Sequence, residues 1–109
     1  MDDVFKALAD PTRRQILDSL KNEDGQSLGE LEAQFPDITR FAVMKHLKIL
    51  EQAQLLSTRR DGRRKHHYLN AVPIQEISDR WISRFAAPWA QGLIDLRDGI
   101  EQGMGRKKA

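Results

Sequence analysis

Apolar and polar residues follow helical spacing over ITRFAVMKHLKILEQAQLL, residues 38–56. The apolar positions recur at three- and four-residue steps and form one stripe: Val43, Leu47, Ile49 and Leu50. Thr39 precedes the stripe, and its hydroxyl can accept a hydrogen bond from a backbone N–H of the first turn. The pattern predicts a helix over Thr39–Ala53 that packs one face into a core.

Further segments upstream combine helical apolar spacing with start signals: Val4–Leu8, Pro11–Lys21 and Ser27–Gln34. Asp10 before Pro11 is a strong start, because aspartate caps a helix and the fixed φ of proline suits the first turn. Ser27 and Glu30 have the spacing of a capping box. Pro36 ends the third helix, because the residue before a proline avoids helical backbone. These helices can bury their stripes against Thr39–Ala53.

The segment LSTRRDGRRKHHYL, residues 56–69, has strand-like spacing instead. Its runs Leu56–Arg60 and Arg63–Leu69 flank Asp61 and Gly62. This pair is preferred by type I′ hairpin turns, in which both central positions need positive φ. The segment contains five basic side chains and one acidic side chain. It predicts a basic β-hairpin.

A second long apolar stripe runs from Pro73 to about Gln102. Its members are Ile77, Trp81, Phe85, Trp89, Leu93, Leu96 and Ile100. Pro88 either kinks this helix or splits it in two, because its ring removes a backbone hydrogen bond and crowds the preceding turn. We expect residues 1–102 to form a single domain and residues 103–109 to form a disordered basic tail.

Composition excludes several classes of function. The 109 residues are 39% hydrophobic and 31% charged, as in a globular protein, and contain no cysteine for disulfides, thiolate metal sites or thiol nucleophiles. His66 and His67 are neighbours on a strand and point to opposite faces, and we expect His46 to be partly buried and bonded to the backbone. No catalytic signature supports an enzyme. We expect no cofactor or metal, and a cytoplasmic protein without a membrane span.

A short helix, a tight turn and a longer helix form a helix-turn-helix, and the hairpin makes it a winged helix of mainly α class. Net charge is only +2, so the case for an anionic partner rests on where the cations lie. We expect the longer helix to read the DNA major groove at base edges through Thr39, Arg40, Met44 and Lys45. Phe41 either touches a thymine methyl or lies against the preceding helix. Candidates for phosphate contact are Lys48, Arg59, Arg60, Arg63, Arg64 and Lys65.

The C-terminal stripe is longer than a three-helix core of this size can cover, so the remainder predicts an interface. We expect a homodimer that uses Phe5, Leu8, Ile77, Trp81, Phe85, Trp89, Leu93 and Leu96. Such a dimer places two reading helices about 34 Å apart, for adjacent half-sites. Two alternatives stay open: a winged-helix module that binds another protein, and a sensor with a small apolar ligand near Trp81 and Trp89.

These segments together resemble the ArsR-type (arsenic-repressor-like) winged-helix transcriptional regulators. The resemblance is carried by FKALADPTRRQIL at residues 5–17, SLGELEAQF at 27–35, the helix at 38–56 and RRDGRRKHHYLN at 59–70. It implies a homodimeric bacterial repressor of its own or adjacent genes that binds a short palindromic operator. The helix Thr39–Ala53 would read that operator, and Leu56–Leu69 would be the wing.

The departures from the family pattern concern metal sensing. Metal-sensing members carry cysteines on the helix matched by Leu28–Gln34, or histidines and carboxylates on the C-terminal helix. This chain has GELEAQF at the first place, and Glu76 and Asp79 without histidine at the second. It therefore resembles a metal-independent subgroup, and we expect a repressor with no metal or thiol effector.

Overall fold

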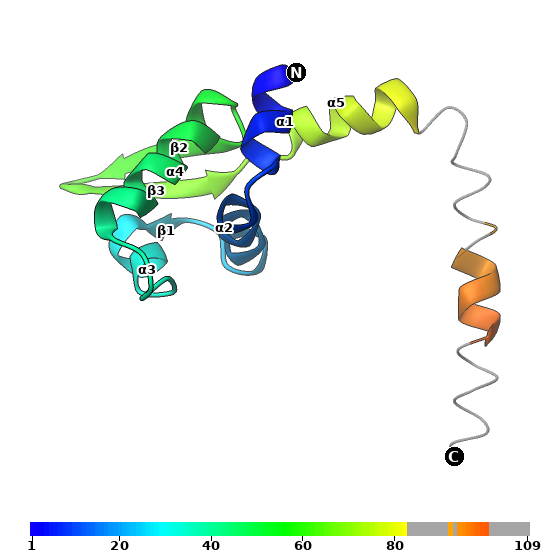
Figure 1. The fold of residues 1–109 in the computed structure, drawn as a ribbon, viewed down its shortest axis with the longest axis horizontal. Helices are drawn as coiled ribbons and strands as arrows, with labels where there is room; N and C mark the ends of the chain where they lie inside the picture. Colours follow the sequence, from blue (N-terminus) through cyan, green and yellow to red (C-terminus); the bar gives the residue numbers. More distant parts are fainter. Residues whose placement is uncertain (83–91, 93, 101–109) are drawn as a thin grey trace, which may run out of the picture. The chain divides into compact units, whose positions relative to one another are not determined.

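The computed structural model describes residues 1–82, 92 and 94–100 (Figure 1). The chain divides after Ile74 into two units, and the helix that starts at Val72 begins in the first unit. The elements are α1 (Asp2–Leu8), α2 (Pro11–Asn22), β1 (Gln26–Ser27), α3 (Leu28–Glu32), α4 (Arg40–Gln52), β2 (Leu56–Asp61), β3 (Arg64–Leu69) and α5 (Val72–Trp81). This is the predicted winged helix-turn-helix, mainly α with a small antiparallel sheet.

The core of the first unit lies where α1, α2, α3 and α4 meet the start of β2. Its largest fully buried side chains are Ile16, Leu20, Leu31, Val43, Leu50 and Leu55. The predicted stripe of α4 is buried at Val43, Leu47 and Leu50 and half-buried at Ile49. One face of α4 is therefore fixed against the core, and its other face is left at the surface.

The predicted start of α2 is confirmed in its cap. Asp10 accepts hydrogen bonds from the backbone N–H groups of Thr12 at 2.8 Å and Arg13 at 3.1 Å, with Pro11 at the first helical position. Burial alone would raise the pKa of Asp10, but these backbone donors, together with the charges of His46 and Arg13, hold it below its usual value. The cap fixes where α2 begins.

The helix-turn-helix is capped at both of its helices. Ser27 and Glu30 form the predicted capping box of α3. Thr39 Oγ1 accepts from the Ala42 N–H at 3.1 Å and fixes the first turn of α4. Such caps stabilise a protein by roughly 1 kcal/mol each. They set the start of the surface helix.

The third helix is shorter than predicted, because it ends at Glu32 and not at Gln34. The side chain of Gln34 donates instead to Gln26 Oε1 at 2.7 Å. Gln26 is only 3% exposed, and its Nε2 donates to the Ser19 and Glu23 carbonyls and to Ser19 Oγ. This network, which is buried at Gln26, connects the end of α3 to α2.

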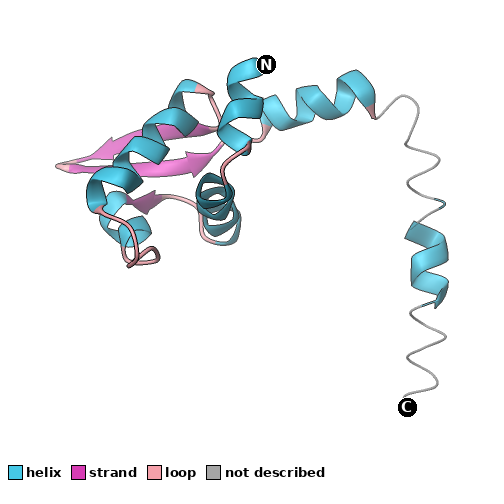
Figure 2. Cartoon of the chain, in the orientation of Figure 1, coloured by secondary structure: helices cyan, strands magenta, loops and turns pink. Residues whose placement is uncertain are grey.

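Within the described part of the chain the strands form one antiparallel sheet in the order β1-β3-β2 (Figure 2). The hairpin β2–β3 was predicted, whereas β1 was not. Gln26 pairs with His67, and Ser27 pairs with His66. A two-residue strand has no periodic pattern of its own, so only its pairing with β3 defines it.

The hairpin turn differs from the prediction by one residue. Asp61 pairs with Arg64, so Gly62 and Arg63 occupy the central positions. Gly62 has φ +62°, and Gln54 is the only non-glycine among the described residues with positive φ. A positive φ at the first central position alone is the sign pattern of a type II′ turn, and the type I′ prediction was wrong. The turn carries a cation, Arg63, at its tip.

Helix α4 ends in a Schellman motif. The Leu55 N–H donates to the Leu50 carbonyl at 3.0 Å, and the Gln54 N–H donates to the Glu51 carbonyl at 2.9 Å. Gln54 adopts φ 61°, a left-handed conformation that usually favours glycine. This reversal sends the chain directly from α4 into the wing.

Gln54→Gly is expected to stabilise the protein by about 1 kcal/mol, because glycine adopts the left-handed conformation without a Cβ penalty. The measurement is urea unfolding, with a higher midpoint at unchanged slope. Gln15→Gly is the matched control: Gln15 is exposed within α2, and glycine there costs about 1 kcal/mol. A lower midpoint for Gln54→Gly would contradict the strain assignment.

The predicted helix Pro73–Gln102 falls partly outside the described residues. Residues 72–81 and 94–100 are helical, whereas Pro88 lies outside the described ranges. None of the residues of α5 is buried. None of the helices in the described ranges has the length and the apolar character that a membrane span requires.

Candidate nucleic-acid interface

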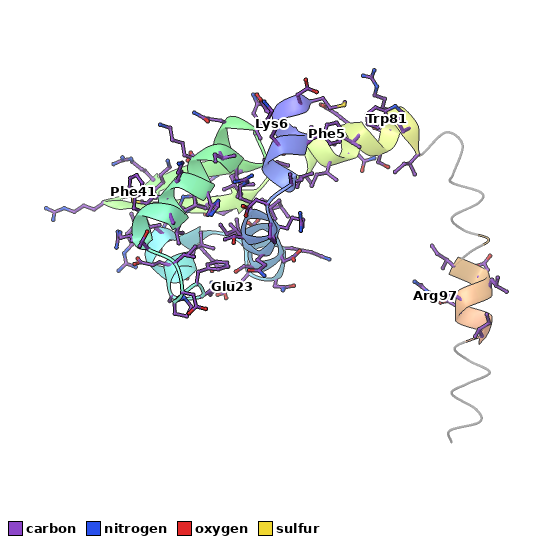
Figure 3. The ribbon with its side chains drawn as sticks, viewed as in Figure 1. Phe5, Lys6, Glu23, Phe41, Trp81 and Arg97 are labelled. Atoms are coloured by element: carbon purple, nitrogen blue, oxygen red, sulfur yellow. The ribbon has the colours of Figure 1, made fainter. Side chains whose placement is uncertain are left out.

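The surface face of α4 mixes large apolar and cationic side chains. Phe41, Met44, Lys45 and Lys48 follow helical spacing on one side, opposite the buried stripe. Phe41 is 74% exposed and Met44 is 49% exposed. Figure 3 shows Phe41 at the N-terminal end of α4, on the side away from α2. At this exposure Phe41 does not pack into the preceding helix, and its contact with a thymine methyl stays a prediction.

A groove of about 820 Å³ lies between α4 and the hairpin. Its floor and walls are lined by Leu28, Phe41, Met44, Lys45, Leu47, Lys48, Ile49, Glu51, Gln52, Lys65 and His67. The set joins predicted contact residues of the helix to Lys65 of the wing. Leu28, Gln52 and His67 also belong to it, although no motif or spacing marks them as site residues.

Two of the predicted contact cations are held by acidic side chains. Arg40 Nη1 lies 3.3 Å from Glu32 Oε2 at the end of α3. Lys65 Nζ lies 3.0 Å from Glu51 Oε1 on α4. Exposed pairs of this kind contribute roughly 0–1 kcal/mol, so their main effect is to orient the cations. Both acids were missed, because their partners are distant in sequence.

The other cations of α4 carry no such restraint. Among the residues that the structure describes, no acidic side chain pairs with Lys45 or Lys48. Both are exposed, and both line the groove. Thr39 at the helix start is exposed as well, although its hydroxyl is engaged in the cap. Lys45 and Lys48 are therefore the cations of α4 that are available to an anionic partner at no cost in broken ion pairs.

Four of the five cations of the hairpin divide between its two faces, and the fifth, Arg63, lies at the tip. Arg60 pairs across the strands with Lys65, and alternate residues of a strand point to opposite faces. Arg60 and Lys65 thus share the face toward α4, and Arg64 lies on the other face with Arg59. The Arg59 guanidinium lies 5.8 Å from the centre of the Tyr68 ring. The predicted phosphate contacts therefore do not form one surface, and those nearest to α4 are on one side of the wing.

The histidine side chains lie within hydrogen-bond distance of residues from other parts of the fold. His46 Nδ1 lies 3.3 Å from Arg13 Nη1, so the expected bond to the backbone was wrong. His66 Nδ1 and His67 Nδ1 lie 2.9 and 3.0 Å from the carbonyls of Gly25 and Gln26. They connect β3 to β1. Within the described ranges no group of three metal-ligating side chains occurs.

The predicted dimer residues are only partly described. Phe5, Trp81 and Leu96 are exposed, and Leu8 and Ile77 are half-buried. Phe85, Trp89 and Leu93 lie outside the described residues, and so does part of the candidate ligand site near Trp81 and Trp89. Further exposed apolar side chains, which were not among the predicted dimer residues, are Val72, Ile74, Ile82, Ile94 and Ile100.

Known proteins are similar to this chain in sequence and in architecture. A family model described as a helix-turn-helix domain matches residues 8–59. The transcriptional repressor SdpR of Bacillus subtilis is 40% identical over 85 residues, which are 78% of this chain and 91% of SdpR. An ArsR-like transcriptional regulator from Rhodococcus sp. RHA1 superposes with a TM-score of 0.67 at 30% identity, over 93% of this chain and 90% of its own. Another ArsR family regulator gives a TM-score of 0.67 at 29% identity, over 82% and 89%.

Proposed function

Because the chain belongs to the ArsR-type winged helix-turn-helix transcriptional regulators, we propose that it is a homodimeric repressor that occupies a palindromic operator without a metal effector. The relatives and the fold are those of DNA-binding regulators and not of enzymes. The proposal is carried by one observation: the surface face of α4 presents exposed Lys45 and Lys48 beside a basic hairpin.

The proposed division of labour follows from charge and position. The first turns of α4 approach base edges through Thr39, Arg40, Phe41, Met44 and Lys45. Cations that contact phosphates supply affinity without sequence information, and these are Lys48, Arg59, Arg60, Arg63, Arg64 and Lys65. A repressor of this design acts by occupying DNA that RNA polymerase needs.

The metal-independent part of the proposal rests on ligand chemistry. The chain has no cysteine, so α3 offers no thiolate at the place where metal-sensing relatives carry cysteines. In α5 the carboxylates are Glu76 and Asp79, and Asp79 accepts a hydrogen bond from Gln75 Nε2 at 2.9 Å. Two carboxylates without a histidine or a thiolate are a poor site for transition metals that prefer nitrogen or sulfur ligands.

Lys48→Ala and Arg63→Ala are expected to lower the affinity for the DNA upstream of the gene. Each substitution removes one cation per protomer, so the loss should correspond to about one phosphate contact in each half-site. Arg40→Ala is expected to weaken it as well, although the effect is reduced by the Glu32 pair. Gel-shift titration at fixed salt measures all three. Lys21→Ala is the matched control, because Lys21 is an exposed cation at the end of α2 and not on the surface face of α4. Wild-type affinity in both Arg40→Ala and Arg63→Ala would contradict the site assignment.

The proposed homodimer is supported by the character of α5. None of its residues is buried, and Trp81 is 53% exposed. Exposed tryptophan with neighbouring isoleucines is a composition typical of interface centres. A two-fold dimer through this helix would present two copies of α4 to two half-sites of one palindrome.

A further inference from the structure

We propose that Phe41, assisted by Met44, recognises the 5-methyl groups of thymine in the operator, so that this regulator prefers thymine at a fixed place in each half-site. The inference rests on the proposed function, and it adds the base that α4 reads. It concerns the apolar part of the surface face of α4, which cannot bind phosphate.

Exposure sets these two side chains apart from the other large apolar side chains of α4. Phe41 is 74% exposed and Met44 is 49% exposed, three residues apart on the same face. Both line the groove, beside Leu28, Leu47 and Ile49. Single exposed apolar side chains are ordinary, but a contiguous apolar patch on a surface that faces a partner marks contact.

The surroundings of the patch indicate the chemistry of its occupant. Lys45, Lys48 and Lys65 line the same groove with one acidic side chain, Glu51, which pairs with Lys65. The lining therefore keeps an excess of positive charge, which favours a polyanion there over a neutral apolar partner. In B-DNA the phosphates flank the major groove, and base edges form its floor. An apolar patch between cations is thus complementary to an apolar feature of base edges.

Thymine alone supplies that feature among the four bases. Adenine, guanine and cytosine carry no methyl group in the major groove, whereas thymine presents its C5 methyl there beside its O4 acceptor. The phenyl ring of Phe41 and the thioether of Met44 form no strong hydrogen bond with adenine, guanine or cytosine. If either side chain were buried against one of these bases, the donors and acceptors of that base would be left without partners. The preference for thymine therefore has two causes: the apolar contact with its methyl group favours thymine, and the unpaired polar groups disfavour the other bases.

The position of Phe41 in its helix fits this role. Reading helices contact base edges with their N-terminal residues, and Phe41 is the second residue of α4. The cap at Thr39 fixes the first turn, and the Glu32 pair draws Arg40 toward α3. Phe41 is left as the most exposed large apolar side chain of the helix.

The experiment starts with selection of a binding sequence for the full-length protein from randomised double-stranded DNA. Each thymine of that sequence is then replaced by deoxyuridine, which removes the methyl and keeps every hydrogen-bonding group. One thymine per half-site is expected to respond, with affinity falling about fourfold for each methyl removed and about fifteenfold for both. Fluorescence anisotropy with labelled DNA measures the ratio.

Protein variants assign the effect to side chains. Phe41→Ala is expected to lose most of the preference for thymine over deoxyuridine DNA, because the methyl then keeps only the contact with Met44. Lys48→Ala is the control, since removal of a phosphate-binding cation weakens both complexes and leaves their ratio at the wild-type value. Both positions are exposed, so neither variant disturbs the core.

The outcomes separate this inference from the proposed function. If specific binding is unchanged when deoxyuridine replaces any of the thymines, the protein does not recognise a thymine methyl, and the repressor proposal is left intact. Retention of the full deoxyuridine effect by Phe41→Ala would overturn the assignment to Phe41. Failure to select or bind any DNA sequence would overturn both proposals together.

Discussion

Affinity for operator DNA is expected to fall by about 10³- to 10⁵-fold when monovalent salt rises from 50 to 200 mM, if the dimer makes six to ten phosphate contacts. Each cation that binds a phosphate releases condensed counterions, and raising the salt opposes that release. Lys48 and the wing cations of two protomers suffice for such a number. Anisotropy titration over a salt series measures the slope of log affinity against log salt, about 0.9 per contact.

Two variants calibrate this slope. Arg63→Ala removes a cation at the hairpin tip from each protomer and is expected to lower the slope by about one for each phosphate that the variant no longer binds. Lys21→Ala removes an equal charge from the end of α2 and is expected to leave the slope unchanged. A flat salt response in the wild-type protein would contradict the role of the basic wing, whatever the affinity at low salt.

The ion pairs within the site modulate this effect. A phosphate that contacts Arg40 or Lys65 must compete with Glu32 or Glu51, which lie 3.3 and 3.0 Å away. The carboxylates already screen these cations in the free protein, so fewer counterions are released when DNA binds. Lys45 and Lys48 have no such competitor among the described residues. Of these two, Lys48 is the proposed phosphate contact, and its contribution to the salt slope is therefore expected to exceed that of Lys65.

The features that could be predicted from sequence are local ones. The caps at Asp10, Ser27 and Thr39 each depend on residues two or three positions away, and all of them form. The apolar stripe of α4 predicted its buried face for the same reason. The fold class follows from these local signals, because few arrangements bury such stripes together.

The features that could not be predicted depend on partners far along the chain. Strand β1 is defined only by the pairing of Gln26 and Ser27 with β3, which lies about 40 residues further along the sequence. Lys65 acquires Glu51 as its partner only once the hairpin returns beside α4. The turn at Gly62 shifted because Asp61 extends β2 by one pair, which a residue-pair preference does not reveal. The sequence therefore identifies the cations of the hairpin, whereas their positions and ion-pair partners follow only from the structure.

Trp81→Ala is expected to raise the dimer dissociation constant by at least about 30-fold, the usual effect of removing an aromatic side chain at an interface centre. Trp81 is 53% exposed in α5, and Arg80 lies over its ring at 5.3 Å. By two-fold symmetry the change occurs twice in one interface. Sedimentation equilibrium over a concentration series measures the constant. Operator affinity at low protein concentration should fall with it, because a monomer occupies one half-site only.

The control for this prediction lies on the same helix. Glu76 is an exposed residue of α5, and Glu76→Ala changes the charge of the helix without removing apolar area. We expect it to leave the dimer constant near the wild-type value. A wild-type protein that stays monomeric at high concentration would contradict the homodimer itself. A dimer of Trp81→Ala as tight as the wild type would instead place the interface elsewhere, because truncation at the centre of an interface cannot be neutral when that side chain is buried on association.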